Sequence, residues 1–338
     1  MKRINVKVVS NKVNDGIVYQ RLHLPLSYLS REKYSITCED TDSIRHTDLY
    51  YTDVLIMNHC FRMDEYYLFE RARHHYNVKT VLDLDDLLTD VPSDHPAYEA
   101  FKNRPVAQIL QSVNHTVFST NYLKEKLGHL TKEATVIPNA INTRLYDRLG
   151  KVEKRYKNCF IVGWTGGQSH RSDQLYTFLN GLEKFMDLYP DTKAYFHVLC
   201  PDRLYRKYGQ RIIFEPEVVN FMDYPQMSAS YPFDVCLVGL QPNEFNESKS
   251  DLKLLEMGAH SIPIIASPRA DFIQHKARDL MLYADTDEQW FDALEFAYKN
   301  QDVMKQLGEK AREYIMNERR AEHAAYAWDK VLEKLVTD

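Results

Sequence analysis

The chain has 338 residues, and its 43 Lys and Arg against 48 Asp and Glu give a formal net charge of −5. This balance excludes a basic nucleic-acid-binding surface over the whole chain, and no apolar run approaches the roughly 20 residues of a transmembrane helix. The five cysteines are odd in number and lack zinc-site spacing, so we expect reduced packing residues in a cytoplasmic protein. A chain of this length has room for two domains.

Twelve short runs rich in Val, Ile and Leu follow one another along the chain, six in each half, with helical patterns between them. Such runs are typical of parallel strands that helices cover on both faces. We therefore predict an α/β fold of two Rossmann-like, doubly wound domains that face each other across a cleft. The predicted strands are Ile4–Ser10, Tyr34–Glu39, Asp53–His59, Lys79–Asp85, Thr116–Thr120, Thr135–Pro138, Cys159–Trp164, Ala194–Cys200, Arg211–Phe214, Asp234–Leu240, Ile262–Ser267 and Met281–Ala284.

The charged segment 149–158 carries no strand signal, which places the domain boundary close to it. We expect a first domain over residues 1–150 and a second over residues 151–318, followed by a terminal helical unit over residues 319–338. The three helices predicted near the end of the chain are Asp287–Lys299, Asp302–Met316 and Arg319–Leu335.

Candidate functional residues in the first half follow predicted strands, at the edge where a cleft would lie. Gly16, in a turn after the first strand, would put backbone N–H groups at the cleft, with Arg21 just behind it. Asp85 and Asp86 end the fourth strand and could orient or deprotonate an acceptor hydroxyl. His59, after the third strand, is a second candidate for that role. A surface turn and structural side chains are the alternatives.

A basic pattern interleaved with aromatic residues covers residues 62–79 and contains Arg62, Arg71 and Arg73. Basic side chains attract phosphates and aromatic rings stack on bases, so this cluster could bind a phosphorylated or nucleic-acid acceptor. A solvated helix face is the alternative.

In the second half, Gly166 and Gly167 follow a buried strand and precede His170 and Arg171. Glycines let a backbone approach a phosphate closely, and a helix that starts after them would add free N–H groups. His170 and Arg171 could then pair with a diphosphate. An ordinary turn is the alternative.

Further along, a helix, a turn and a buried strand are predicted in a segment whose polar residues are regularly spaced. Ser248 or Ser250 can cap the helix. Lys249, Lys253 and Glu256 recur at i, i+4 and i+7, which predicts one shared helix face. The two lysines could bind a diphosphate and the glutamate could accept hydrogen bonds from ribose hydroxyls. A solvated lysine–glutamate face is the alternative.

This segment, Asn246–Ser267, resembles the signature of the retaining glycosyltransferases of family 4, also called group 1, which have the GT-B fold. In that family a glutamate before a small apolar stretch, a turn and a strand holds the donor ribose, and Glu256 matches it. The family's other glutamate, eight positions earlier, is replaced here by Ser248. A subset of the family has an N-x-x-K-S-x-x-K-x-x-E pattern, which is matched by Asn246, Lys249, Ser250, Lys253 and Glu256.

The resemblance implies a hexosyl- or pentosyltransferase that uses a nucleotide diphosphate sugar, most simply a UDP-sugar, and retains the anomeric configuration. It implies that Val218 lies near the base, that Lys249 stabilises charge on the leaving diphosphate, and that the last helix crosses back onto the first domain. It implies no metal cofactor, because helix ends and cations take its place. The expected donor contacts are Gly16, Arg21, Gly166, Gly167, His170, Arg171, Val218, Asn246, Ser248, Lys249, Ser250, Lys253 and Glu256.

The acceptor is expected to be a saccharide or glycan, or a hydroxymethylated pyrimidine in phage DNA, with Arg62, Arg71 and Arg73 as contacts. Two other classes of protein stay open. A nucleotide-sugar epimerase or a phosphorylase would also use two Rossmann-like domains. The serine at position 248 would also suit a non-catalytic nucleotide-sugar-binding protein.

Overall fold

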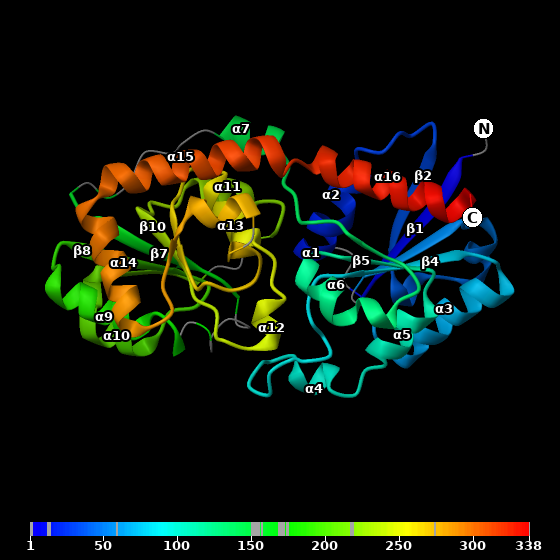
Figure 1. Ribbon diagram of the computed structural model, residues 1–338, viewed down its shortest axis with the longest axis horizontal. Coiled ribbons are helices and arrows are strands. Elements are labelled where there is room, and N and C mark those ends of the chain that lie inside the picture. The colour runs from blue at the N-terminus through cyan, green and yellow to red at the C-terminus, as the bar shows by residue number, and fades with distance from the viewer. Residues whose placement is uncertain are drawn as a thin grey trace.

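The structure is a computed structural model that describes residues 3–11, 15–58, 60–149, 156, 158–167, 173, 176–216, 220–273 and 275–337. The described elements form two halves that lie side by side, each built on one sheet with helices on both faces (Figure 1).

The first sheet is entirely parallel and has the strand order β2-β1-β3-β4-β5-β6. Its central strands are continuous apolar runs because both of their faces are covered, and every residue of β3 is buried. The strands are β1 (Ile4–Ser10), β2 (Tyr34–Asp40), β3 (Val54–Asn58), β4 (Lys79–Leu84), β5 (His115–Phe118) and β6 (Ala134–Val136).

The second sheet is also parallel, with the order β12-β11-β10-β7-β8-β9. Together the two sheets confirm the predicted class, an α/β protein with two doubly wound, Rossmann-like halves. Some predicted strands run past the observed ends, because apolar residues such as Leu240 continue into loops beyond the sheet edge. The strands are β7 (Phe160–Thr165), β8 (Thr192–His197), β9 (Ile212–Glu215), β10 (Val235–Val238), β11 (Ile264–Ala266) and β12 (Leu282–Tyr283).

The helices lie between these strands and after the last of them. Those that precede β7 in the chain are α1 (Gly16–Val18), α2 (Leu24–Leu26), α3 (Met63–His75), α4 (Tyr98–Phe101), α5 (Val106–Ser112), α6 (Asn121–Leu127) and α7 (Thr143–Leu149), the last of which packs on the second half (Figure 1). Those that follow are α9 (Leu179–Leu188), α10 (Asp202–Tyr208), α11 (Tyr224–Ala229), α12 (Glu244–Glu247), α13 (Leu252–Gly258), α14 (Asp287–Lys299), α15 (Gln301–Glu318) and α16 (Ala321–Thr337).

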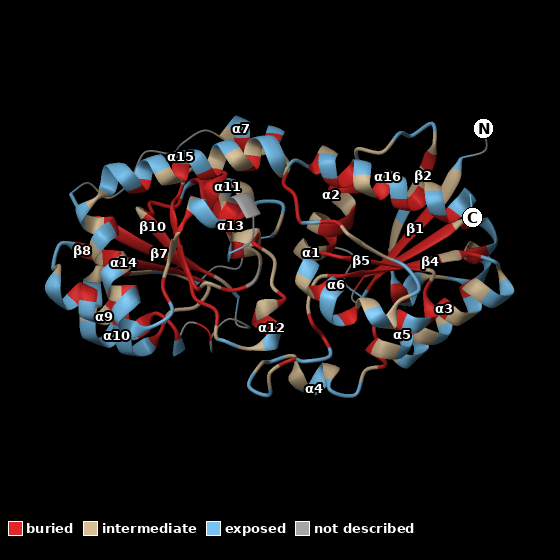
Figure 2. Ribbon diagram, viewed as in Figure 1, coloured by how far each residue is buried: buried red, intermediate tan, exposed pale blue. Residues whose placement is uncertain are grey.

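Alternating side chains of each strand enter different cores, one on each face of the sheet. In β3, Leu55 and Met57 join the core under α3 and α5, whereas Val54 and Ile56 join the core under α2 and α16. The second sheet is covered in the same way by two further clusters. The central strands are therefore the most buried elements of both halves (Figure 2).

The last two helices connect the halves. Helix α15 packs on the second half, and α16 continues across onto the first, where Trp328 is fully buried (Figure 1). The chain crosses once more at Ile141, whose backbone N–H donates to Arg319 O at 2.9 Å while its carbonyl accepts from Ala321 N at 3.0 Å. These two hydrogen bonds therefore join the chain at Ile141 to the junction between α15 and α16.

Candidate functional site

A cavity of about 260 Å³ lies between the two halves, at the carboxyl ends of β4, β7 and β10. We call it the interdomain cavity. In parallel α/β sheets this edge is where ligands bind, because loops and helix starts meet there. Its lining residues are Ile17, Asp85, Asp86, Trp164, Thr165, Gly166, Gly167, Leu237, Val238, Gly239, Leu240, Lys249, Ser250, Leu252, Lys253 and Phe272.

Lys249 spans the cavity. Its Nζ donates to Asp86 Oδ1 at 2.7 Å, which is an ion pair between the two halves, and lies 4.3 Å from the centre of the Phe245 ring. Both charged side chains are about one-fifth exposed, at 20% for Lys249 and 19% for Asp86. The cavity thus contains a lysine that a carboxylate from the opposite wall neutralises.

Lys253 is the second cation of the cavity. Its Nζ donates to Glu256 Oε2 at 2.7 Å and to the hydroxyl of Tyr224 at 3.2 Å, and that hydroxyl donates to the same carboxylate at 3.1 Å. Burial works to lower the pKa of Lys253, but the charge and hydrogen bond of Glu256 outweigh it and raise that pKa. Lys253 is therefore held protonated at the cavity wall. Glu256 does not line the cavity, and its contribution there is to hold Lys253 in place.

The helix that carries these residues begins later than expected. Helix α13 starts at Leu252, so Lys249 and Ser250 lie in the preceding loop and the expected common helix face with Lys253 and Glu256 is wrong for Lys249. Neither serine caps the helix. Asp251 occupies the N-cap position, and its carboxylate instead forms a bidentate pair with Arg319 at 2.5 and 2.8 Å.

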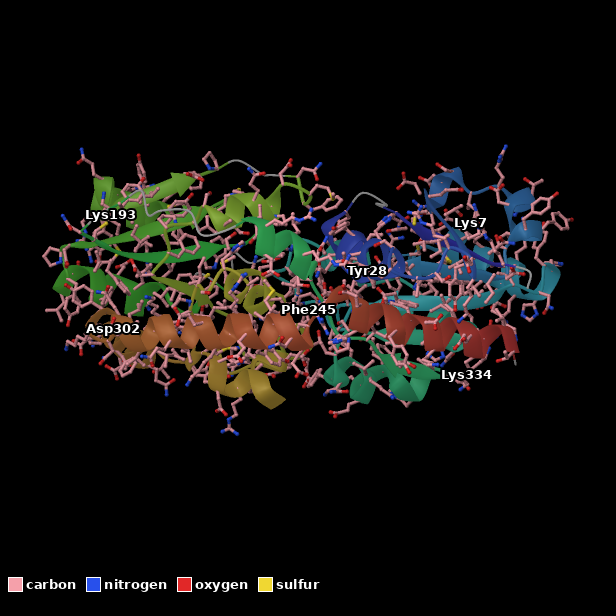
Figure 3. All side chains as sticks on the ribbon, turned by 90° about the horizontal axis from the view of Figure 1, so that it is seen from above. Lys7, Tyr28, Lys193, Phe245, Asp302 and Lys334 are labelled. Atoms are coloured by element: carbon pink, nitrogen blue, oxygen red, sulfur yellow. The ribbon has the colours of Figure 1, made fainter. Side chains whose placement is uncertain are left out.

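The start of α13 is displaced because residues 244–250, which we call the docking segment, pack on the first half. Phe245 joins the core of the first half and lies between the two halves in Figure 3. The buried hydroxyl of Ser248 accepts from Leu87 N at 3.2 Å, and Ser248 O accepts from Thr120 Oγ1 at 3.3 Å. Ser248 therefore joins the halves and does not line the cavity.

Asn246 and Ser250 are two further predicted donor contacts, and only one of them lines the cavity. Asn246 is buried, and its amide donates to Asp173 Oδ1 at 2.8 Å and to Gln241 O at 3.1 Å, so it holds these two residues together and does not line the cavity. Ser250 does line the cavity, and its hydroxyl accepts from Asn139 Nδ2 at 2.7 Å. The expected position of Ser250 at the cavity thus fits the structure, whereas that of Asn246 does not.

Asp85 faces the cavity from the first half. Burial raises the pKa of its carboxyl, with the neighbouring Asp86 adding to the rise and Arg21 opposing it. One of its oxygens lies 3.5 Å from Nδ2 of Asn139, the amide that also binds Ser250. A carboxylate with a raised pKa at this place is suited to accept a proton from a hydroxyl.

Arg21 and Gly16 do not line the cavity themselves. Arg21 is buried in a bidentate pair with Asp83, at 2.7 and 3.2 Å, and also donates to Ile137 O. Arg21 therefore joins Asp83 and Ile137 within the first half and does not line the cavity. A Cβ at Gly16 would approach that of Phe221 to 3.2 Å, so this glycine serves close contact between the halves, and Ile17 lines the cavity in its place.

The arginines of the basic cluster all have partners. Arg62 contacts the carboxylates of Asp42, Asp64 and Glu65, and Arg71 contacts the ring of His46. The third, Arg73, lies 3.8 Å from a carboxylate oxygen of Glu70. Carboxylates therefore offset the charges of Arg62 and Arg73, whereas the His46 ring gives Arg71 a hydrogen-bond partner without offsetting its charge.

Gly166 and Gly167 line the cavity as expected, and a Cβ at Gly166 would meet the Trp164 ring at 2.7 Å. His59, His170, Arg171 and Val218 lie outside the described residues. The sequence does not reveal the partners of Tyr224 and Asn139, because these partners are 29 and 111 residues away.

Within the part of the chain that the structure describes, no three His, Cys, Asp or Glu side chains are grouped as a metal site would require. The helices of that part include none whose length and apolar content would let it cross a membrane.

Neither the protein-family models nor the curated protein sequences gave a match to this chain. Among solved structures, it is similar to a glycosyltransferase from Rickettsia africae, with 12% identity, 100% of both chains covered and a TM-score of 0.72. It is also similar to Anabaena HepE in complex with UDP and glucose, with 10% identity, 98% of this chain and 100% of that chain covered, and a TM-score of 0.71. It is similar as well to sucrose-phosphate synthase from Thermosynechococcus elongatus, with 13% identity, 99% of this chain and 100% of that chain covered, and a TM-score of 0.70. At these identities the likeness shows the fold, which confirms the expected GT-B arrangement, whereas membership of family 4 stays a prediction.

Proposed function

We propose that the protein is a glycosyltransferase that moves a sugar from a nucleotide diphosphate sugar, most simply a UDP-sugar, to an acceptor hydroxyl. The observation that carries this proposal is the interdomain cavity. There, two lysines on one wall face two carboxylates on the other, at the carboxyl edges of two Rossmann-like sheets.

The lysines have the role of a metal ion in this proposal. Negative charge builds on the leaving diphosphate as the glycosidic bond breaks, and preorganised cations stabilise that charge in a site screened from water. Lys253 is already fixed by Glu256 and Tyr224, and Lys249 becomes available when the diphosphate replaces Asp86 as its partner. We therefore expect turnover to persist in excess EDTA.

The acceptor side is formed by the first half. Asp85 is the group that we propose to orient the acceptor hydroxyl and take up its proton, because it faces the cavity and burial raises its pKa. We assign residues 1–150 to the acceptor domain, 151–318 to the donor domain and 319–338 to the connecting helix. Retention of configuration is carried over from the resemblance to family 4.

Two comparisons support this choice of donor. HepE has the same fold and was solved with UDP and with UDP-glucose, and the Rickettsia africae protein is described as a glycosyltransferase. A saccharide acceptor is the choice that we favour over modified DNA, since Arg62 and Arg73 of the basic cluster are already paired with carboxylates.

A donor panel tests the proposal. Purified protein is incubated with UDP-, ADP- and GDP-sugars and a set of saccharide acceptors, and both the released nucleoside diphosphate and the sugar product are measured. We expect release coupled to transfer for one nucleotide. A sugar altered at one stereocentre while still linked to nucleotide would indicate an epimerase, and tight binding without turnover would indicate a binding protein.

A further inference from the structure

A second cavity, of about 410 Å³, lies on the first half between residues 41–46 and residues 62–71. We call it the α3 groove, because the first turns of α3 form one wall. Its volume is within the range of sites that bind small molecules, about 300–1,000 Å³. None of its lining residues belongs to the interdomain cavity.

The α3 groove opens at the same edge of the first sheet as the candidate catalytic carboxylate. Its walls follow the carboxyl ends of β2 and β3, and Asp85 follows the end of β4. The strand order β2-β1-β3-β4 separates β2 from β4 by three strand spacings. At about 4.8 Å per spacing, that is a distance of about 15 Å along the edge.

The charges of the α3 groove do not favour a phosphate. Arg62 is held by Asp42 at 2.7 Å, Asp64 at 3.0 Å and Glu65 at 3.2 Å. The positive end of α3 is also occupied, because the backbone N–H of Arg62 donates to Glu65 Oε2 at 2.7 Å. An anionic ligand would have to displace these carboxylates, so a polyanion such as DNA is disfavoured.

The same side chains suit a neutral ligand rich in hydroxyl groups. Carboxylates accept hydrogen bonds and guanidinium groups donate them in fixed directions, so neighbouring hydroxyls of a sugar find partners of both kinds. The Asp42 and Asp64 side chains are 79% and 68% exposed, so a ligand in the groove can reach their carboxylates. Tyr67 adds an aromatic side chain that is 60% exposed at the wall, on which the apolar face of a sugar ring can pack.

We propose that the α3 groove is a remote acceptor subsite for a neutral oligosaccharide, whose terminal sugar reaches Asp85 along the edge of the first sheet. This inference rests on the proposed function, since it names the class of acceptor for the same site. It predicts that acceptors long enough to span the edge bind better than a single sugar, because only they contact both places.

The test uses UDP-glucose as donor and neutral gluco-oligosaccharides of one to six units as acceptors, with kcat and KM measured for each length. We expect KM to fall about tenfold between the shortest and the longest acceptors, which corresponds to about 1.4 kcal/mol. In Tyr67→Ala and in Asp42→Asn, the KM of the six-unit acceptor should rise about tenfold toward that of the single sugar. Tyr205→Ala, which changes a similarly exposed tyrosine on α10, should keep the wild-type ratio.

Equal KM values at every length, or transfer to DNA but to none of the oligosaccharides, would overturn the inference. So would variants that raise the KM of short and long acceptors by the same factor. Binding of UDP and hydrolysis of UDP-glucose without acceptor are measured in parallel. If these also fail and the donor panel yields no turnover with any nucleotide, the proposed function fails; if binding or turnover of a donor persists, only the acceptor subsite is wrong.

Discussion

At the scale of single residues, the two lysines of the interdomain cavity differ in the origin of their partners. Lys253 pairs with Glu256, three residues away on the same helix, so the sequence pattern already indicated a relation between them. Lys249 pairs with Asp86, 163 residues earlier in the chain. No local pattern reveals such a pair, because it depends on how two separately folded sheets are placed.

The position of Asp86 predicts that its substitution strengthens nucleotide binding, whereas most substitutions at a binding site weaken it. Its carboxylate lines the cavity and pairs with Lys249, which we propose to bind the diphosphate, so Asp86→Asn should remove a repulsion and free Lys249. We expect UDP affinity to rise by roughly three- to tenfold, on the scale of 1 kcal/mol for charges a few ångströms apart in a wet site. Isothermal titration calorimetry checks this, and a weaker affinity would show that Asp86 supports donor binding.

Glu256 should behave in the opposite way, because it does not line the cavity and holds Lys253 in place. Glu256→Ala removes that partner and leaves Lys253 less firmly held. We expect UDP binding to weaken by roughly 1–3 kcal/mol, the scale of a lost hydrogen bond to a charged group. The same calorimetry on Glu309→Ala, an exposed glutamate of α15, is the control and should match the wild type. Equal affinities in both variants would remove Glu256 from the donor site.

At the scale of elements, the sequence predicted the strands well and the start of α13 poorly. Continuous apolar runs determine the strands. Side chains on both faces of a covered strand are buried in a core, so nearly every residue of the run is apolar. The start of α13 depends on the docking segment, whose serines contact the first half and leave the helix uncapped by a side chain. Ser248 and Ser250 carry the local signal of a cap, but the tertiary contacts override it.

The docking segment should connect stability with donor binding. Phe245 is buried in the core of the first half, and truncation of such a ring costs about 3–5 kcal/mol. We therefore expect Phe245→Ala to lower the free energy of unfolding by about that amount and to raise the KM for the donor. Denaturant titration and steady-state kinetics measure the two effects. Phe296→Ala, on the half-exposed side of α14, should change neither by a comparable amount; equal losses in the two variants would contradict the role of this segment.

At the scale of the whole molecule, a buried cluster of charges lies where the halves meet. Asp251 is paired with Arg319, and burial raises the pKa of the nearby Asp271 to about 7, with Asp251 adding to the rise. In an unfolded chain an aspartate titrates near 3.9. Between these values the folded state binds more protons than the unfolded state, so folding stability should fall as the pH rises from about 4 to about 7.

Asp271→Asn tests this pH dependence. The amide cannot ionise, so we expect the variant to be more stable than the wild type at pH 8 and to lose much of the decline in stability between pH 4 and pH 7. Denaturant unfolding across that range provides the measurement. A wild-type stability that increases through this window, with an unchanged slope in the variant, would show that the cluster is solvated in solution.

The central claim is that a nucleotide diphosphate binds between the two halves. The most direct measurement is calorimetric titration of UDP, ADP and GDP into the wild-type protein and into Lys253→Ala, whose cation is fixed at the cavity wall. The account predicts saturable binding of one nucleotide, and at least about tenfold weaker binding of that nucleotide to the variant. No binding of any of the three to a folded wild-type protein, or equal binding to both proteins, would contradict it.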